Sequence, residues 1–520
     1  MSQKKLLRNI SMMSSAVFLS RVIGLVRDTV MAYFFGTTKL NDAFIVAYKI
    51  PNLLRALFGE GALSTAFVPL YNEIGIKRGR RAQMEFALQV VSILCFILSI
   101  LTLLGLIFAP LIVRLLYPGL AESTKLLAID LSRIMLPYLF LIGLSSTLIA
   151  ILNSHDYFFM TGLSSALLNI GMLSTIFIPW LLLKPDKETL VYWAAWGVFV
   201  GGIFQTIINF PYLRKVGYRF KVLISFRGEA ISAMWKRFIP SMIGIGVREI
   251  NVIADSLMAS FLAVGSITAL EFGNRLIHMP MGIFAVSTGT ALLPLYSRHM
   301  TQRNFGELSQ SLRFSAITLA YVMLPITMLI MLLSDDFVYL LFQRGAFDAR
   351  ASLMTQQALS FYGIGLIFYS LNQTITPLFY AARDTKTPVK IAAYIVSLNI
   401  VLNFILMQFM QHRGLALSTS VTAAINYNVL LWQIRKRLPE VSFSGIWPNI
   451  IKAALLCLFL YMPLRWLKDA WSADGKGIIL IRDGVFTAVV FVSFYFLGMA
   501  IKLPYLRESA NGIWRKLARK

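Results

Sequence analysis

The sequence predicts an all-α polytopic membrane protein with about fourteen transmembrane helices. Of its 520 residues, 57% are hydrophobic and only 14% are charged, against roughly 45–50% and about 25% in soluble domains. Charge-free runs such as 86–113, 157–183 and 351–382 exceed the roughly 20 residues that cross a bilayer as a helix. The net charge of +25 lies largely in short connections between apolar runs, where it indicates topology. Nucleic acid is therefore not an expected partner.

Division of the apolar runs at charged residues, glycine and proline gives the expected helices in chain order. They lie near residues 9–36, 42–70, 84–116, 126–152, 157–183, 190–213, 238–262, 266–297, 314–342, 352–380, 390–411, 414–434, 447–464 and 480–501. An even number of spans puts both termini on one side of the membrane. With the termini inside, Lys and Arg number 29 on the inner segments and 11 on the outer ones. This asymmetry predicts that both termini are cytoplasmic.

An internal repeat predicts two pseudo-symmetric six-helix lobes. Aligned residues at an offset of 227 are Arg21, Asp28, Met31, Ala32 and Phe34 with Arg248, Asp255, Met258, Ala259 and Phe261. Further along, Leu168-Asn169-Ile170 recurs as Leu398-Asn399-Ile400. The common order and nearly constant offset indicate duplication, as in transporters that rock two bundles around a central site.

The long polar interruption at 214–237, in the middle of the chain, sets the expected domain boundaries, and the repeat supports them. We predict an N-lobe at residues 1–213, a cytoplasmic inter-lobe linker at 214–237 and a C-lobe at 238–437. Residues 438–520 have no counterpart in the first repeat, and they are predicted to add two helices and a basic tail.

Several ionisable residues fall inside predicted spans, where each costs at least about 2.5–3.5 kcal/mol. Three interpretations are open: ion pairs between helices, such as Arg27 with Asp28 or Asp42 and Arg55 with Glu60, charged side chains that snorkel from the helix ends, or a polar cavity. Arginine and lysine outnumber the acids in this group, and the planar guanidinium suits phosphate oxygens. We therefore predict an anionic, phosphorylated substrate. The candidate substrate-binding residues are Arg21, Arg27, Asp42, Arg55, Glu60 and Arg275.

A second polar group predicts a cation site in the C-lobe. Asp255, Asn399, Asn403 and Thr419 all offer oxygen ligands, which suit a hard cation such as sodium. The alternative is a network of amides holding helices together, or pairing of Asp255 with Arg248 or Arg275. The sequence contains no recognisable catalytic triad or nucleotide-binding fingerprint. We therefore expect a transporter with no catalytic residues and no cofactor other than a possible sodium ion.

Three segments resemble those of the MurJ (MviN) family of lipid II flippases, in the multidrug/oligosaccharidyl-lipid/polysaccharide exporter superfamily. They are SRVIGLVRD at 20–28, NDAFIVAYKIPNLLRALFGEGALSTAFVP at 41–69 and RDTKTPVK at 383–390. The resemblance extends over nearly the whole chain, including the last two helices. It implies that lipid II, a polyprenyl diphosphate bearing a disaccharide-pentapeptide, is moved to the outer leaflet of the bacterial inner membrane by alternating access, for peptidoglycan synthesis.

The resemblance also assigns residues. It implies that Arg21, Arg27, Arg55 and Arg275 are cavity arginines and that Asp42 is a cavity acid. Asn274 and His278 stand where acidic residues can occur in the family. Because the prenyl tail need not leave lipid, a groove between the last two helices and the C-lobe is expected to hold it; the alternative is that these two helices only stabilise the lobe.

Three other classes compete with a lipid II flippase. One is an exporter of another polyprenyl-diphosphate-linked oligosaccharide. A multidrug or cation antiporter of the same fold is expected to have an acidic, aromatic-lined cavity, and a membrane glycosyltransferase is expected to have acidic pairs in large polar loops. The intramembrane arginines and short outer loops of this chain favour the exporters.

Overall fold

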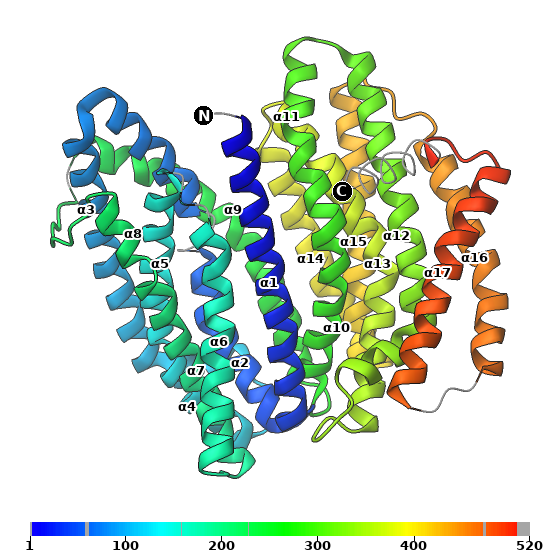
Figure 1. The fold of residues 1–520 in the computed structure, drawn as a ribbon, viewed down its shortest axis with the longest axis horizontal. Coiled ribbons are helices and arrows are strands. Elements are labelled where there is room, and N and C mark those ends of the chain that lie inside the picture. Colours follow the sequence, from blue (N-terminus) through cyan, green and yellow to red (C-terminus); the bar gives the residue numbers. More distant parts are fainter. Residues whose placement is uncertain are drawn as a thin grey trace. The chain divides into compact units, whose positions relative to one another are not determined.

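The computed structural model describes residues 3–57, 62–155, 157, 159–226, 228–471 and 475–506, and within these ranges it contains helices and no strand (Figure 1). Ten of the described helical stretches are long and apolar enough to cross a membrane. This confirms the predicted all-α polytopic membrane fold. The chain divides into two compact units, one of residues 1–268 with 344–347 and the other of residues 269–343 with 348–520.

The first unit contains nine helices of its own and the first turn of a tenth. They are α1 (Gln3–Phe35), α2 (Lys39–Arg55), α3 (Ala62–Leu116), α4 (Glu122–Met135), α5 (Pro137–Asn153), α6 (Phe159–Leu182), α7 (Lys187–Ile207), α8 (Phe210–Lys215), α9 (Glu229–Ala259) and the start of α10 (Ser266–Pro280). The long α3 is two helices joined at a kink, because Gly79 has a φ of 81°. The part of α3 before Gly79 continues the second predicted span (42–70), and the part after Gly79 corresponds to the third (84–116).

The second unit contains the remaining helices. They are the rest of α10, a π-helical segment (Met281–Val286), α11 (Ser287–Thr301), α12 (Phe305–Leu341), α13 (Ala349–Ala381), α14 (Lys386–Met410), α15 (His412–Arg437), α16 (Ile446–Ala470) and α17 (Lys476–Ala500). Side-chain caps define two of the starts: Asn304 accepts a hydrogen bond from the backbone N–H of Glu307, and Asp348 accepts one from that of Ala351.

Close helix packing in both units depends on small residues. In the first unit, a Cβ on Gly171 of α6 would lie 2.4 Å from the Cα of Gly201 on α7. In the second, a Cβ on Gly365 of α13 would lie 2.7 Å from the Cα of Ser420 on α15. Small residues at a crossing let two helices approach closely. Van der Waals packing then holds the helices together, because the surrounding lipid gives no hydrophobic driving force for their association.

Helix α9 begins before its predicted position. The sequence predicts a linker over 214–237, but α9 starts at Glu229, so only 216–226 and Gly228 of that stretch are described as non-helical. In α9, Met234 and Phe238 join an apolar cluster with Leu63 and Phe67 of α3. The first helix of the second repeat therefore packs within the first unit, and the lobe boundaries predicted from the repeat stay a prediction.

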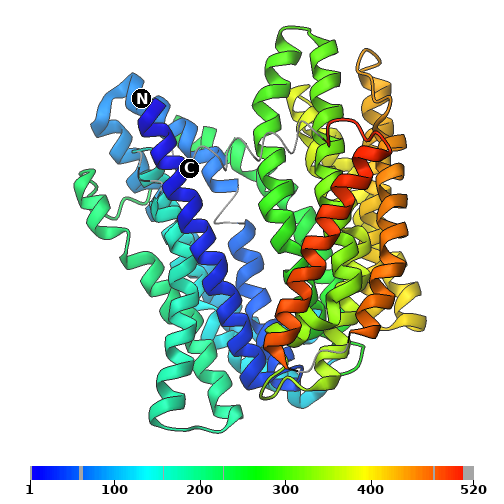
Figure 2. The ribbon, with the colours of Figure 1, turned by 45° about the vertical axis from the view of Figure 1, so that its right-hand side comes forward.

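The last two helices pack against α12 (Figure 2). A buried ionic cluster joins the three helices: Lys468 of α16 lies 2.8 Å from Asp336 of α12, and Arg482 of α17 lies 2.6 Å from the same carboxylate. Arg482 also lies 3.2 Å from its neighbour Asp483. Removing one partner would leave an uncompensated buried charge, which is costly, so the packing of the additional helices on α12 depends on this pairing.

Candidate functional site

The best-defined group of predicted site residues surrounds Arg27 of α1. Its guanidinium donates to Oδ1 of Asp28 from Nε at 3.1 Å and from Nη2 at 2.8 Å, and its Nη1 donates to Oδ1 of Asn169 on α6 at 2.8 Å. All three residues are buried, and the side chains of Arg27 and Asp28 are each 10% exposed. This confirms the interpretation that Arg27 pairs with Asp28, and it adds a third residue from a helix distant in sequence.

Helices α1 and α6 approach closely at this cluster. A Cβ on Gly24 would lie 3.3 Å from Nδ2 of Asn169, and that amide donates at 3.4 Å to the carbonyl of Ser20. A larger residue at position 24 would therefore push against the amide that orients Arg27. Gly24 therefore allows the close contact between α1 and α6. It does not interrupt α1, which is helical throughout Gln3–Phe35.

Asp42 lies at the start of α2 and is predicted to be a cavity residue. Its carboxylate is 2% exposed and accepts three hydrogen bonds, from the N–H of Gly265 at 2.6 Å and from the N–H and hydroxyl of Thr268 at 3.0 and 2.7 Å. Gly265 has a φ of 91°, and a Cβ there would lie 2.5 Å from the carbonyl oxygen of Thr37. In this structure Asp42 caps the first turn of α10, where the helix dipole also favours a negative charge.

A polar contact joins α2 to α9. Nζ of Lys49 donates to Oγ of Ser256 at 2.7 Å. Beside it, Lys49, Asn52 and Glu249 line a cavity of about 30 Å³, together with apolar residues of α2, α3 and α9. Glu249 is buried, although it was not among the predicted site residues. The sequence could have identified Glu249, because it is an acidic residue in the middle of the expected span 238–262. The other candidate residues were chosen by the same rule, since they are charged residues inside expected spans.

The remaining predicted arginines have different surroundings. Arg21 is exposed on α1, and Arg55 at the end of α2 donates from Nε to Oδ1 of Asn52 at 2.8 Å. Arg275 of α10 lies 3.3 Å from Glu271, one turn away, and its side chain is one-third exposed. Arg275 belongs to the second unit, so convergence of the four arginines on one cavity stays a prediction. Glu60 lies outside the described residues.

The predicted cation ligands are divided between the units. Asp255 of α9, in the first unit, accepts a hydrogen bond from Nδ2 of Asn251 at 3.4 Å. In the second unit, Nδ2 of Asn403 donates to Oδ1 of Asn399 at 3.0 Å, and both residues are buried. Thr419 donates to the carbonyl oxygen of Leu415 in its own helix.

Asn399 also reaches α15 through hydroxyl groups that the sequence analysis did not include. Its Nδ2 donates to Oγ of Ser418 at 3.1 Å and to Oγ1 of Thr422 at 3.2 Å. The amide network expected as the alternative to a cation site is therefore present around Asn399.

The RDTKTPVK segment forms the turn between α13 and α14. Oδ1 of Asp384 accepts from the N–H of Thr387 at 3.0 Å, and its other oxygen pairs with Arg437 at the end of α15. Desolvation of the Asp384 carboxyl opposes its ionisation, but the hydrogen bonds from Thr387 and the charge of Arg437 outweigh this and lower its pKa. The segment is a capped turn, as its proline and basic residues indicate.

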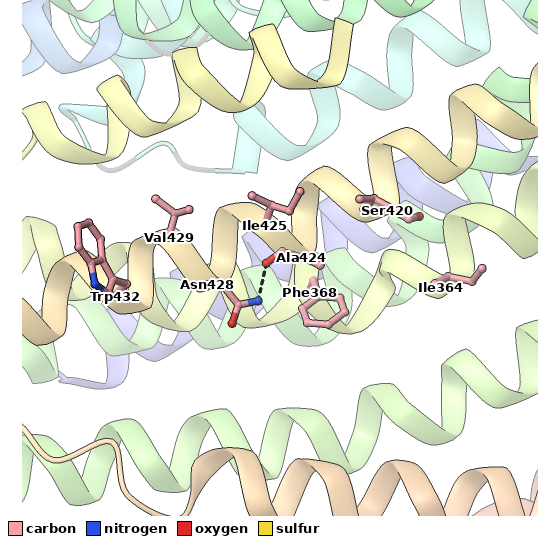
Figure 3. Close-up of a pocket in the computed structure, with 9 residues that line it drawn as sticks. Ile364, Phe368, Ser420, Ala424, Ile425, Asn428, Val429 and Trp432 are labelled. Atoms are coloured by element: carbon pink, nitrogen blue, oxygen red, sulfur yellow. Dashed lines mark hydrogen bonds between the residues drawn. The ribbon is translucent and has the colours of Figure 1, made fainter. Parts of the chain in front are cut away.

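An apolar groove of about 470 Å³ lies between α13 and α15 in the second unit (Figure 3). Phe368, Ile425 and Trp432 are among its lining residues, and Nδ2 of Asn428 donates within α15 to the carbonyl of Ala424. A second cavity of about 460 Å³ is lined by residues of α12, α13 and the start of α17, including Asp335 and Asp336. The sequence analysis expects the groove for the prenyl tail beside the last two helices. The cavity that lies there is partly acidic, whereas the apolar groove lies between α13 and α15.

These features define the class of the protein. It has multiple apolar helices of membrane-spanning length, a duplicated sequence, and buried charged groups at helix contacts of the first unit. Ionisable groups are kept at such positions in transport pathways and relays. These are the features of a multi-pass membrane transporter.

Comparison with known proteins gives the family. Residues 31–485 match the family model described as lipid II flippase MurJ. A probable lipid II flippase MurJ of Buchnera aphidicola subsp. Baizongia pistaciae is 32% identical over 460 residues, which cover 88% of this chain and 89% of the relative. The lipid II flippase MurJ of Burkholderia cenocepacia is 30% identical over 521 residues, covering 97% and 100%. The chain belongs to the lipid II flippase MurJ family and is a multi-pass inner-membrane protein.

Solved structures agree with this assignment. A lipid II flippase MurJ in an inward closed conformation superposes with a TM-score of 0.80 at 27% identity, covering 94% of this chain and 99% of that one. An inward-facing multidrug resistance MATE transporter of the MOP superfamily gives a TM-score of 0.70 at 14% identity, covering 82% and 96%. At that identity the second likeness shows the fold alone.

Proposed function

We propose that this chain moves lipid II from the inner to the outer leaflet of the cytoplasmic membrane by alternating access. The observation that carries the proposal is membership of the lipid II flippase MurJ family over residues 31–485. A diphosphate head group must cross about 30 Å of hydrocarbon, and cationic groups inside the protein would replace its hydration. The arginines of α1, α2 and α10 supply such groups.

Arg21, Arg27, Arg55 and Arg275 are the proposed diphosphate ligands. Exposed Arg21 is available for a first contact, whereas Arg27 already donates to Asp28 and Asn169. A diphosphate would compete with Asp28 for the Arg27 guanidinium, because phosphate oxygens accept the same forked hydrogen bonds as a carboxylate. Binding of the head group would then loosen the contact between α1 and α6, which links substrate occupancy to helix movement.

With both termini in the cytoplasm, the α1–α2 turn lies at the outer end of the first unit. We propose that this turn and the start of α10 close the outer side. Asp42 supports this by capping α10, and the N–H of Ala346 donates to the carbonyl of Tyr33 at 2.8 Å. These contacts would break when the protein opens outward. Asp42 would thus contribute to the access change, in addition to its predicted place in the cavity.

The coupling ion is also a proposal. Asp255, Asn399, Asn403 and Thr419 are the proposed ligands of one sodium ion, because all four offer oxygen atoms. The buried amides of Asn399 and Asn403 support this, since they offer neutral oxygens that a single carboxylate would complement. Asp255→Ala should abolish any sodium-dependent thermal stabilisation. Equal shifts of the parent protein with sodium and choline chloride would remove the reason for the site.

Two measurements test the proposed function. Expression of the chain should restore growth to bacteria depleted of their lipid II flippase, and purified protein in vesicles should move lipid II between leaflets. A chain that inserts into the membrane at normal levels but does neither is not a lipid II flippase. Movement of other prenyl-diphosphate oligosaccharides at the same rate would instead favour the broader exporter class.

A further inference from the structure

The connection between α8 and α9 exposes a run of large apolar side chains. Residues 218–226, the linker strip, form neither helix nor strand. Four of their side chains are more than half exposed: Phe220, Val222, Ile224 and Phe226. These four occupy every second position, so an extended stretch places them on one face. An exposed apolar patch of this kind marks a surface that contacts another protein or a membrane.

Two contacts fix the position of the linker strip along α3. The N–H of Leu223 donates to Oγ of Ser92 at 2.9 Å. The ring of Phe226 lies edge-on to that of Phe96, with 6.2 Å between the ring centroids. Ser92 and Phe96 belong to the charge-free run 86–113 of the third expected span. The linker strip therefore runs beside a membrane-spanning helix, and its depth can be counted along that helix.

The count places the linker strip at one boundary of the hydrocarbon. Arg114, in the last turn of α3, pairs with Glu122 in an exposed contact and marks the far boundary. About 20 helical residues cross the hydrocarbon core, and counting back about 20 from Arg114 reaches Leu94. Ser92 and Phe96 lie on either side of that position. The irregular backbone of the strip also requires a boundary position, because unpaired N–H and C=O groups are not tolerated in contact with hydrocarbon.

Both ends of the linker strip are tied to the bend of α3. Nη2 of Arg80 donates to the carbonyl oxygen of Val216 at 2.8 Å, just before the strip. After the strip, Glu229 at the start of α9 lies 3.1 Å from Arg78. The bend of α3 precedes Ser92 by about 20 Å of helix. The bend thus lies beyond the hydrocarbon boundary, whereas the middle of the strip reaches that boundary.

Basic side chains accompany the apolar ones. Arg219 and Lys221 alternate with the apolar residues of the linker strip and are exposed. Arg214 and Lys215 are exposed in the last turn of α8, just before the strip. The sequence 214–228 contains no acidic residue. At the membrane boundary these cations lie at the level of the lipid head groups, where each Lys or Arg favours an anionic surface.

We propose that the linker strip is a membrane-interface anchor that binds anionic phospholipids. Its apolar side chains enter the outermost acyl region of the adjacent leaflet, and its basic side chains contact the lipid phosphates, as in amphipathic interfacial segments. In the predicted topology this leaflet is the cytoplasmic one. The inference concerns the surrounding membrane lipid and involves neither lipid II nor its movement between leaflets, so it goes beyond the proposed function.

The test measures the depth and the lipid surroundings of the strip. It uses the full chain with Cys95 and Cys457 replaced and with Val222→Cys labelled by an environment-sensitive fluorophore. The protein is reconstituted in vesicles of phosphatidylcholine and phosphatidylglycerol, and bromine atoms near the top of the acyl chains of one lipid at a time act as quenchers. Both brominated lipids should quench the fluorophore. At equal content the anionic lipid should be enriched around it about fivefold, since one basic residue near the surface contributes about that factor.

Matched variants control for depth and for charge. Ile76→Cys carries the fluorophore at another exposed apolar position, close to the bend of α3, and should show little quenching. Arg219→Gln with Lys221→Gln should lower the enrichment towards one and leave quenching by phosphatidylcholine unchanged. Lys184→Gln with Lys187→Gln removes two exposed charges at the turn between α6 and α7 and should not change the enrichment.

Two results would overturn the proposal. Quenching at Val222→Cys no stronger than at Ile76→Cys would place the linker strip in water, as expected if it packs only on α3 or binds a soluble protein. Equal quenching by the neutral and the anionic lipid would overturn the assignment to anionic phospholipids. The vesicles contain no lipid II, so neither result depends on whether the chain is a flippase.

Discussion

The carboxylate of Asp42 on α2 receives both the N–H and the hydroxyl of Thr268, which lies 226 residues later in the chain. Two helices that are distant in sequence are thus joined by one buried acid. Asp42→Ala should lower the free energy of unfolding by about 1.5–3 kcal/mol, because hydrogen bonds to a buried charged acceptor are lost. Asp42→Asn should cost less, since its side chain keeps one acceptor oxygen. Thermal or denaturant unfolding in detergent measures both.

The same contact predicts a change in access. In a chain whose Cys95 and Cys457 are replaced, Ser266→Cys should label slowly with a membrane-impermeant maleimide, because Ser266 is buried. Adding Asp42→Asn should increase labelling from outside. Asp186→Asn, at the exposed start of α7, is the matched control and should leave the labelling rate unchanged. Unchanged labelling with Asp42→Asn would contradict a role for this contact in closing the outer side.

The predicted topology has a direct test. With both termini cytoplasmic, as the charge asymmetry of 29 to 11 indicates, a cysteine at Ser472 should react with an impermeant reagent applied to intact cells. A cysteine at Arg303 should react only after the membrane is permeabilised. The reverse pattern would invert the orientation of every helix.

If the four arginines form a substrate-binding cavity, replacing one of them should weaken lipid II binding without reducing the amount of protein in the membrane. Arg27→Ala and Arg275→Ala should each weaken binding of the lipid II head group about 10- to 150-fold, since one charge-assisted contact is worth roughly 1.5–3 kcal/mol. Arg27→Lys should be intermediate, because an ammonium keeps the charge but not the fork. Membrane expression is measured alongside binding. Well-inserted alanine variants that bind and flip lipid II normally would end the hypothesis.

Asp384 predicts a pH dependence at the α13–α14 turn. Its pKa is lowered in the folded protein, so its stabilising contribution is present above the unfolded pKa of about 3.9 and is lost as pH falls through the lower folded value. The stability difference between the parent and Asp384→Ala should be constant, at about 1 kcal/mol, from pH 5 to 8. It should shrink below about pH 4. Unfolding midpoints measured across this range test the sign, and a difference that grows with acid would contradict it.

The packing of α16 and α17 against α12 should depend on the ion pairs that Lys468 and Arg482 make with Asp336. Arg482→Met should destabilise the protein by about 3–5 kcal/mol, because it leaves Asp336 and Asp483 with less compensation in a buried site. Arg465→Met is the control, since Arg465 pairs with Asp469 on an exposed part of α16 and should cost less than about 1 kcal/mol. Similar losses for both variants would show that burial does not set the strength of this cluster.

The amino-acid sequence by itself determined the fold class and most helix positions. These follow from local properties, because a helix must be apolar for about 20 residues to cross the bilayer and is bounded by charge, glycine or proline. It also identified Arg27 and Asp42 as unusual, because charges inside apolar runs are visible without knowing their partners.

Only the tertiary structure decided what those charges contact. The partner of Arg27 on α6 is 142 residues away, and Asn169 was visible in the sequence only as part of a repeated triplet. Asp42 has the same chemistry as a cavity acid, yet it caps α10 because the start of that helix packs beside α2. Which buried polar groups meet depends on the rotation and crossing of whole helices, and this is fixed by side-chain packing along their full length.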